Sequence, residues 1–140
     1  MTTYGTAKWQ GGLKDGKGAI STKSGALSDY PYGFASRFEG KPGTNPEELI
    51  GAAHAGCFTM ALSLILGEAG FTAEEMNTKA EITLEKQGDG FAITKSHLTL
   101  RAKIPGMEAA KFLELAGMAE KGCPVSKVLK AEITLDAALA

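Results

Sequence analysis

Residues 45–58 read NPEELIGAAHAGCF and open the longest helix that the sequence predicts. Asn45 has a side chain suited to an N-cap, and Pro46 suits the first helical position. Glu48 stands where the acid of a capping box closes back on the N-cap. The helix is expected to continue until Gly70, a residue typical of helix ends.

This helix is unusually apolar. No charged residue occurs between Leu49 and Leu66, and that length is near the lower bound for crossing a bilayer. Acidic residues flank the stretch and neither end is enriched in Lys or Arg, which argues against a membrane span. A helix that is apolar on all sides is instead one buried on all sides. Because a single sheet covers only one face, we expect a second subunit to cover the rest.

The segments around this helix predict a mixed class. Strands are expected at 6–10, at 18–22, at 32–38, in both arms of a hairpin over 76–104 that turns at 87–90, and at the C-terminal end. In the third of these, the alternation places Arg37 on the face opposite the aromatic residues. Helical spacing predicts a helix over 107–120 and a short one over 124–130. The order of elements indicates an α+β fold, and a chain of this length suits one domain over 1–140.

Composition excludes several classes of function. The net charge of −1 gives no basic surface, so neither nucleic acid nor an anionic membrane is expected as a partner. The first eight residues lack the apolar run of a secretory signal, so a cytoplasmic location is expected. In that reducing compartment a disulfide is more often transient and catalytic than structural.

The chain has two cysteines, and their surroundings differ. Cys57 lies about three turns into the long helix, where the helix dipole lowers a thiol pKa little, so a reactive Cys57 needs a nearby cation. Cys123 directly precedes Pro124 at a helix start, where backbone N–H groups favour an anion. Sequence alone therefore predicts Cys123 as the easier thiolate and Cys57 as the more protected thiol. Two buried structural thiols are the plain alternative.

Other sites are not expected. His54 and His97 together with the cysteines could form four zinc ligands, but no pair is closely spaced as structural zinc sites require. His54 is therefore interpreted as a packed or locally bonded histidine. The chain has no Cys-x-x-Cys motif, and its glycine-rich turns near 11–18 lack the context of a phosphate-binding loop.

Three segments resemble one known family. The motif at 44–58, the later segment CPVSK at 123–127, and YPYGF at 30–34 with Arg37 are similar to those of the OsmC/Ohr proteins, the osmotically inducible and organic hydroperoxide resistance proteins. The stretch at 30–37 resembles the OsmC branch rather than the Ohr branch. The order and length of the elements agree with this family over essentially the whole chain.

The resemblance implies a fold, an activity and a site. It implies antiparallel β-sheets packed around a long buried central helix, in an intertwined homodimer with active sites at the subunit interface. It also implies a thiol-dependent peroxidase that reduces organic hydroperoxides, with Cys57 attacking and Cys123 resolving. Arg37 and Glu47 would complete the site. No metal or cofactor is implied; an external dithiol of lipoyl type or a lipoylated protein would recycle the enzyme. The family is associated with oxidative and osmotic stress.

Two other functions stay open at this point. A redox sensor could use the same disulfide to change a binding surface, without steady-state turnover. A non-catalytic ligand-binding module could share the fold and carry inert thiols.

Overall fold

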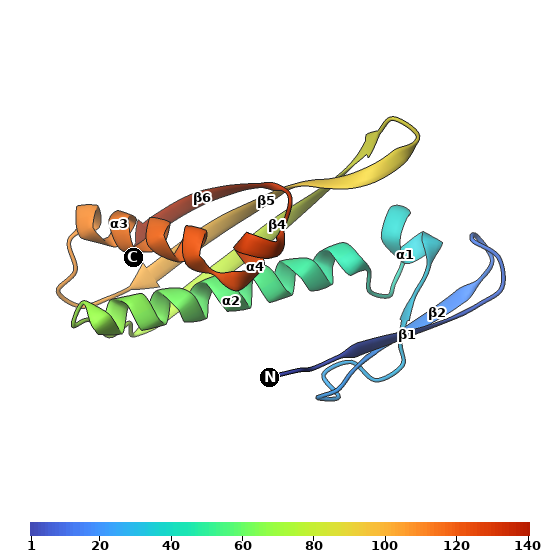
Figure 1. Cartoon of the computed structure of the whole chain (residues 1–140), viewed down its shortest axis with the longest axis horizontal. Helices are drawn as coiled ribbons and strands as arrows, with labels where there is room; N and C mark the ends of the chain where they lie inside the picture. Colours follow the sequence, from blue (N-terminus) through green and yellow to red (C-terminus); the bar gives the residue numbers. More distant parts are fainter. The chain divides into compact units, whose positions relative to one another are not determined.

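Strands and helices alternate irregularly along the chain in the computed structural model, which describes residues 1–140 (Figure 1). The elements are β1 (Gly5–Gln10), β2 (Lys17–Thr22), β3 (Tyr30–Tyr32), α1 (Phe34–Phe38), α2 (Pro46–Glu68), β4 (Glu75–Gln87), β5 (Gly90–Lys103), α3 (Ala109–Gly122), α4 (Pro124–Val128) and β6 (Glu132–Leu139). The class is α+β, as the sequence predicts. The chain divides into two units, residues 1–49 and 50–140.

The first unit contains a small antiparallel sheet in the order β1-β2-β3. The Trp9 and Tyr32 rings meet edge to face, with centroids 5.6 Å apart. Gly18 lies between them, and a Cβ at this position would stand 2.5 Å from the Tyr32 ring and 2.7 Å from the Trp9 ring. Glycine is therefore required here by the close approach of two aromatic rings.

The strand predicted over 32–38 is wrong, because the chain forms the short helix α1 from Phe34 onward. Phe34 and Phe38 are four residues apart and pack together, with ring centroids 5.0 Å apart. The Ser36 hydroxyl accepts the Gly33 N–H at 2.9 Å and donates to the Thr44 carbonyl at 2.8 Å, which fixes the turn. Aromatic residues at alternate positions fit one strand face, but two of them also fit helical spacing, and short apolar runs do not separate the two. Arg37 therefore lies on a helix.

The N-cap of α2 is as predicted, but the expected capping box is not formed, because the Glu48 carboxylate bonds the Thr44 hydroxyl and the Asn45 side-chain amide rather than the Asn45 backbone N–H. The Asn45 side-chain oxygen accepts the Glu48 N–H at 2.8 Å, and the Glu48 carboxylate accepts the Thr44 hydroxyl at 2.8 Å. Gly70, with φ at +86°, follows the last turn. The N-cap hydrogen bond satisfies a backbone N–H that would otherwise have no intrahelical partner.

Replacing this cap gives a first prediction. Asn45→Ala should lower the free energy of unfolding by about 1 kcal/mol, because the Glu48 N–H loses its acceptor. Urea denaturation measures the effect. Asn45→Asp, which keeps a capping oxygen, should retain most of the stability, and equal losses in both variants would show that the cap contributes nothing.

The second unit contains a three-stranded sheet in the order β4-β5-β6. The β4–β5 hairpin turns at Gly88 and Asp89, as predicted, whereas β6 runs parallel to β5. The expectation of purely antiparallel sheets is therefore wrong for this sheet. The chain returns through α3 and α4 before β6, and such a crossover is what a parallel neighbour requires. Since β6 pairs only with residues 95–102 of β5, the hairpin end projects beyond it (Figure 1).

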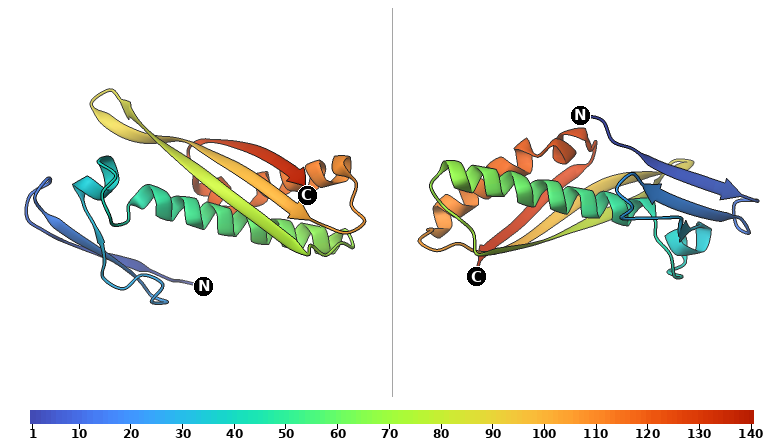
Figure 2. Two further views of the ribbon diagram at one scale, coloured as in Figure 1. Left: turned by 180° about the vertical axis from the view of Figure 1, so that it is seen from behind. Right: turned by 90° about the horizontal axis from the view of Figure 1, so that it is seen from below.

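Helices α2, α3 and α4 lie over one face of this sheet (Figure 2). The core that they share with β5 consists of Phe58, Leu62 and Leu66 from α2, Leu98, Leu100 and Ala102 from β5, Phe112, Leu115, Ala116 and Ala119 from α3, and Ile104 and Cys123 outside these elements. The α2 residues recur every fourth position and form one stripe. Burial of this stripe fixes which side of α2 faces the sheet.

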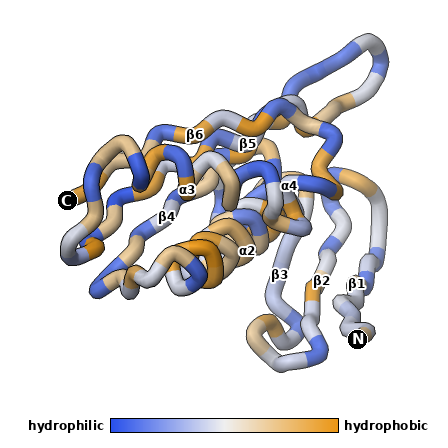
Figure 3. Tube along the Cα trace, turned by 60° about the vertical axis from the view of Figure 1, so that its left-hand side comes forward, coloured by the Kyte–Doolittle hydropathy of each residue, from blue (hydrophilic) through white to orange (hydrophobic).

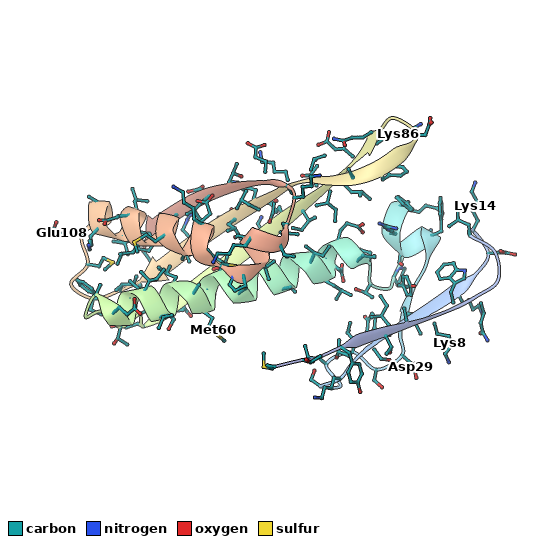
Figure 4. The ribbon with its side chains drawn as sticks, viewed as in Figure 1. Lys8, Lys14, Asp29, Met60, Lys86 and Glu108 are labelled. Atoms are coloured by element: carbon teal, nitrogen blue, oxygen red, sulfur yellow. The ribbon has the colours of Figure 1, made fainter.

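The other side of α2 is not covered within one chain. Hydrophobic residues run along the helix (Figure 3), but only 28% of its most apolar stretch is buried. Met60 and Leu64 are 76% and 65% exposed, and Met60 points away from the sheet (Figure 4). By length and composition alone α2 could cross a membrane, a test that core helices of soluble proteins also pass. The expected burial on all sides is therefore not reached by the single chain.

Candidate redox site

The structure brings the two cysteines together, although they are far apart in sequence. Cys57 lies on α2 and Cys123 lies between α3 and α4, both in the unit 50–140. Both are free thiols, and they lie close enough for each to shift the pKa of the other. The structure thus places the two thiols near each other, as a disulfide between them would require.

Cys123 is held by the junction of two helices. Its N–H donates to the Ala119 carbonyl at the end of α3, at 3.0 Å, and its own carbonyl accepts the Lys127 N–H in α4, at 3.1 Å. Pro124 fills the first position of α4, where a missing N–H costs nothing. Cys123 thus ends one helix and begins the next, and its side chain is fully buried.

The surroundings of Cys123 favour its thiolate. Burial raises the pKa of the Cys123 thiol, but the Cys57 thiol, the Ser126 N–H and hydroxyl, and the Val125 N–H together outweigh it, so the pKa is lowered. The sulfur makes no N-cap hydrogen bond of ordinary geometry, so the two amides act on it as oriented dipoles at longer range. The predicted preference of Cys123 for the ionised form agrees with this arrangement.

The surroundings of Cys57 have the opposite effect. Burial raises the pKa of the Cys57 thiol, its hydrogen bond to Cys123 raises it further, and the Val125 N–H offsets part of the change. Access, however, favours Cys57: it is partly exposed, whereas Cys123 is fully buried. The expectation that Cys57 is the more protected thiol is therefore wrong with respect to solvent access, because Cys57 is the more exposed of the two. The reachable sulfur needs a cation before it can be the better nucleophile.

Arg37 and Glu47 form a two-pronged ion pair in the unit 1–49. Arg37 Nη2 lies 2.6 Å from one Glu47 carboxylate oxygen, and Arg37 Nε lies 3.1 and 3.2 Å from the two oxygens. Glu47 stands in the first turn of α2 and is nearly buried, while the Arg37 side chain is 37% exposed. The pairing holds the guanidinium plane in one orientation. Nη1 makes no hydrogen bond within the chain and can serve a further anion.

The interpretation of His54 as a packed histidine is confirmed, but its hydrogen-bond partners lie 42 and 72 residues away in the sequence rather than locally. His54 is fully buried, and its ring nitrogens bond the hydroxyls of Ser96 on β5 and Ser126 on α4. Ser126 belongs to the segment CPVSK and stands three residues after Cys123, on the same side of the helix turn. That spacing was the available sequence signal.

No group of three or more His, Cys, Asp or Glu side chains is placed to hold a metal ion. The two cysteines offer a pair of interacting thiols, one partly exposed and one buried.

Comparison with known proteins identifies the family. A family model described as "OsmC-like protein" matches residues 38–138. The chain is also 59% identical to Peroxiredoxin OsmC of Escherichia coli (strain K12) over 132 residues, 94% of this chain and 92% of that protein. The chain belongs to the OsmC family.

More distant members of the OsmC family share less sequence. The Organic hydroperoxide resistance protein of Xanthomonas axonopodis pv. citri is 29% identical and covers 72% of this chain and 70% of its own length. The crystal structure of OhrB of Bacillus subtilis superposes with a TM-score of 0.73 at 27% identity, covering 100% of this chain and 98% of that one. The higher identity to the E. coli protein agrees with the resemblance of residues 30–37 to the OsmC branch.

Proposed function

We propose that this OsmC-family protein is a thiol-dependent peroxidase that reduces organic hydroperoxides to alcohols. Relatives named as a peroxiredoxin and as organic hydroperoxide resistance proteins support a peroxidase-type role. The observation that carries the proposal is the meeting of Cys57 and Cys123, with the first accessible and the second buried beside it. Consumption of an organic hydroperoxide with a dithiol as reductant tests it.

In the first step the Cys57 thiolate attacks the distal oxygen of the hydroperoxide. The O–O bond breaks, the sulfur is oxidised to a sulfenic acid, and the alkoxide takes a proton to leave as alcohol. This assignment of the attacking sulfur follows access, because a bulky peroxide cannot reach a sulfur that is fully buried.

In the second step Cys123 attacks the Cys57 sulfenic sulfur. The S–S bond forms, the S–O bond breaks, and hydroxide leaves and is protonated to water. An external dithiol then reopens the disulfide by two exchange reactions and is itself oxidised to a disulfide. We propose a dithiol of lipoyl type or a lipoylated protein for this step, on the family resemblance, and no metal or organic cofactor.

Arg37 and Glu47 are proposed to supply the charge that Cys57 lacks. An Arg37 of either subunit would stabilise the Cys57 thiolate, and Glu47 would keep its guanidinium oriented. The support is twofold: the ion pair leaves Nη1 available, and the surroundings of Cys57 in its own unit disfavour ionisation.

A homodimer is also part of the proposal. A groove between α2 and β4 is lined by residues including Gly56, Met60, Met76 and Thr78, beside the uncovered apolar side of α2. Soluble monomers rarely leave so much contiguous apolar surface on one helix. A cytoplasmic location stays a prediction from the sequence.

The dimer gives a prediction that needs no enzyme assay. Sedimentation should give a mass of twice the 14.6 kDa of one chain. Leu64→Asp should dissociate the dimer, because it buries a charge in the proposed interface. Leu113→Asp is the matched control, since Leu113 is 53% exposed on α3. A monomeric parent protein, or dissociation by both variants alike, would contradict this interface.

A further inference from the structure

A series of buried and part-buried hydrogen bonds leads from Ser96 on the sheet through His54 to Ser126, beside the cysteine pair. His54 Nδ1 lies 2.6 Å from Ser96 Oγ, and His54 Nε2 lies 2.7 Å from Ser126 Oγ. The Ser126 hydroxyl in turn interacts with the Cys123 sulfur. Neither the proposed peroxidase chemistry nor the core packing requires a histidine at this point.

The protonation state of His54 follows from its burial. The ring is fully buried, and burial lowers the pKa of His54, so the imidazole is neutral near neutral pH. A neutral imidazole has one donor nitrogen and one acceptor nitrogen. In the hydrogen bonds that join Ser96, His54 and Ser126, one ring nitrogen of His54 therefore donates and the other accepts, so all the donated protons point the same way.

Ser96 decides that direction. Its hydroxyl is fully buried and has His54 Nδ1 as its one hydrogen-bond partner. A buried hydroxyl proton without an acceptor is costly, so Ser96 donates and Nδ1 accepts. Nε2 then carries the ring proton and donates to Ser126 Oγ. The Ser126 proton remains available to the Cys123 sulfur.

We propose that Ser96, His54 and Ser126 form a positioning relay that aims the Ser126 hydroxyl proton at the Cys123 sulfur and holds that sulfur ready to close the disulfide. Its role in disulfide closure rests on the function proposed above. Ser126 would stabilise the Cys123 thiolate before attack and would release it as the sulfur loses its charge in forming the S–S bond. The relay therefore stabilises the thiolate of the resolving Cys123 and does not stabilise that of the attacking Cys57.

Few other groups can influence this sulfur. The titratable side chain that acts on the Cys123 sulfur is Cys57, on α2. No charged side chain from β5, α3 or α4 acts on the Cys123 sulfur. A change in its titration can thus be traced to the relay.

Titration of a single thiol tests the relay directly. In full-length Cys57→Ser protein, where Cys123 is the remaining thiol, the pH midpoint is followed by the ultraviolet absorbance of the thiolate. Ser126→Ala should raise this midpoint by about one unit, a tenfold loss of thiolate at a given pH below it. Ser126→Thr, which restores a hydroxyl at a half-buried site, should return the midpoint to that of the parent.

A second histidine provides the control. His97 Nδ1 lies 2.6 Å from Thr134 Oγ1 on the same sheet, and that pair leads to no cysteine. His97→Gln should leave the midpoint unchanged, whereas His54→Gln should raise it. An unshifted Ser126→Ala protein, or a Ser126→Thr protein shifted as far as Ser126→Ala, would overturn the relay.

Kinetics separate the relay from the proposed function. With both cysteines present, Ser126→Ala should slow disulfide closure about tenfold after hydroperoxide is added, while Cys57 oxidation keeps its rate. Equal slowing of both steps would contradict an action confined to Cys123. If the parent protein fails to react with hydroperoxide, the peroxidase proposal falls, and the titration still decides the relay.

Discussion

Cys57→Ser is expected to abolish hydroperoxide consumption. A serine hydroxyl is not ionised at neutral pH and is not oxidised by peroxide, so the first step has no nucleophile. The loss should be complete within the sensitivity of the assay, at least about a thousandfold. The measurement is the disappearance of cumene hydroperoxide with excess dihydrolipoamide as reductant.

Cys123→Ser is the matched control for this experiment. It keeps the accessible thiol, so in the absence of dithiol one equivalent of hydroperoxide should be consumed and intact mass should show one added oxygen atom. Turnover should then stall until a dithiol is added, because no internal thiol closes the disulfide. Retained turnover in the Cys57→Ser protein would exclude the mechanism.

The same assay separates the enzyme from a redox sensor. A sensor would oxidise once to the Cys57–Cys123 disulfide and show no steady-state consumption with any dithiol. A ligand-binding module with inert thiols would show neither the oxidation nor the disulfide. Both alternatives share the fold, so the dimer experiment does not distinguish them.

Local signals explain which parts of the fold could be predicted. The N-cap at Asn45, the end at Gly70 and the turn at Gly88 and Asp89 each depend on a few neighbouring residues, and the structure has all three where expected. Helix α1 is too short for its period to separate helix from strand. The parallel pairing of β6 with β5 depends on where the chain returns after two helices, which local patterns do not encode.

In the candidate site, too, the features that depend on neighbouring residues could be predicted, and the contacts between distant elements could not. The helix-start position of Cys123 allowed its thiolate preference to be predicted, because the dipole effect is local. The contact between Cys57 and Cys123 joins different elements and was expected only from the family resemblance. The hydroxyl partners of His54 come from β5 and α4, and a single sequence gives no way to bring them to one ring.

Removing the guanidinium of Arg37 should have the second largest effect. Burial already raises the pKa of the Cys57 thiol, and the proposed cation lowers it. Arg37→Met should therefore raise the pH at which Cys57 becomes reactive and slow its reaction with hydroperoxide at neutral pH by about 100-fold. The measurement is the rate of Cys57 oxidation across pH in Cys123→Ser protein, where the second thiol does not interfere.

The pH profile distinguishes a charge effect from damage to the fold. If Arg37 acts by stabilising the thiolate, raising the pH should restore much of the rate of Arg37→Met, since a high enough pH ionises the thiol without help. Glu47→Gln should give an intermediate loss, because it keeps the cation but weakens the fork that orients it. Arg101→Met is the control: Arg101 pairs with Asp136 at 3.3 Å on an exposed part of the sheet. A parent-like profile for Arg37→Met would show that the charge needed by Cys57 comes from elsewhere.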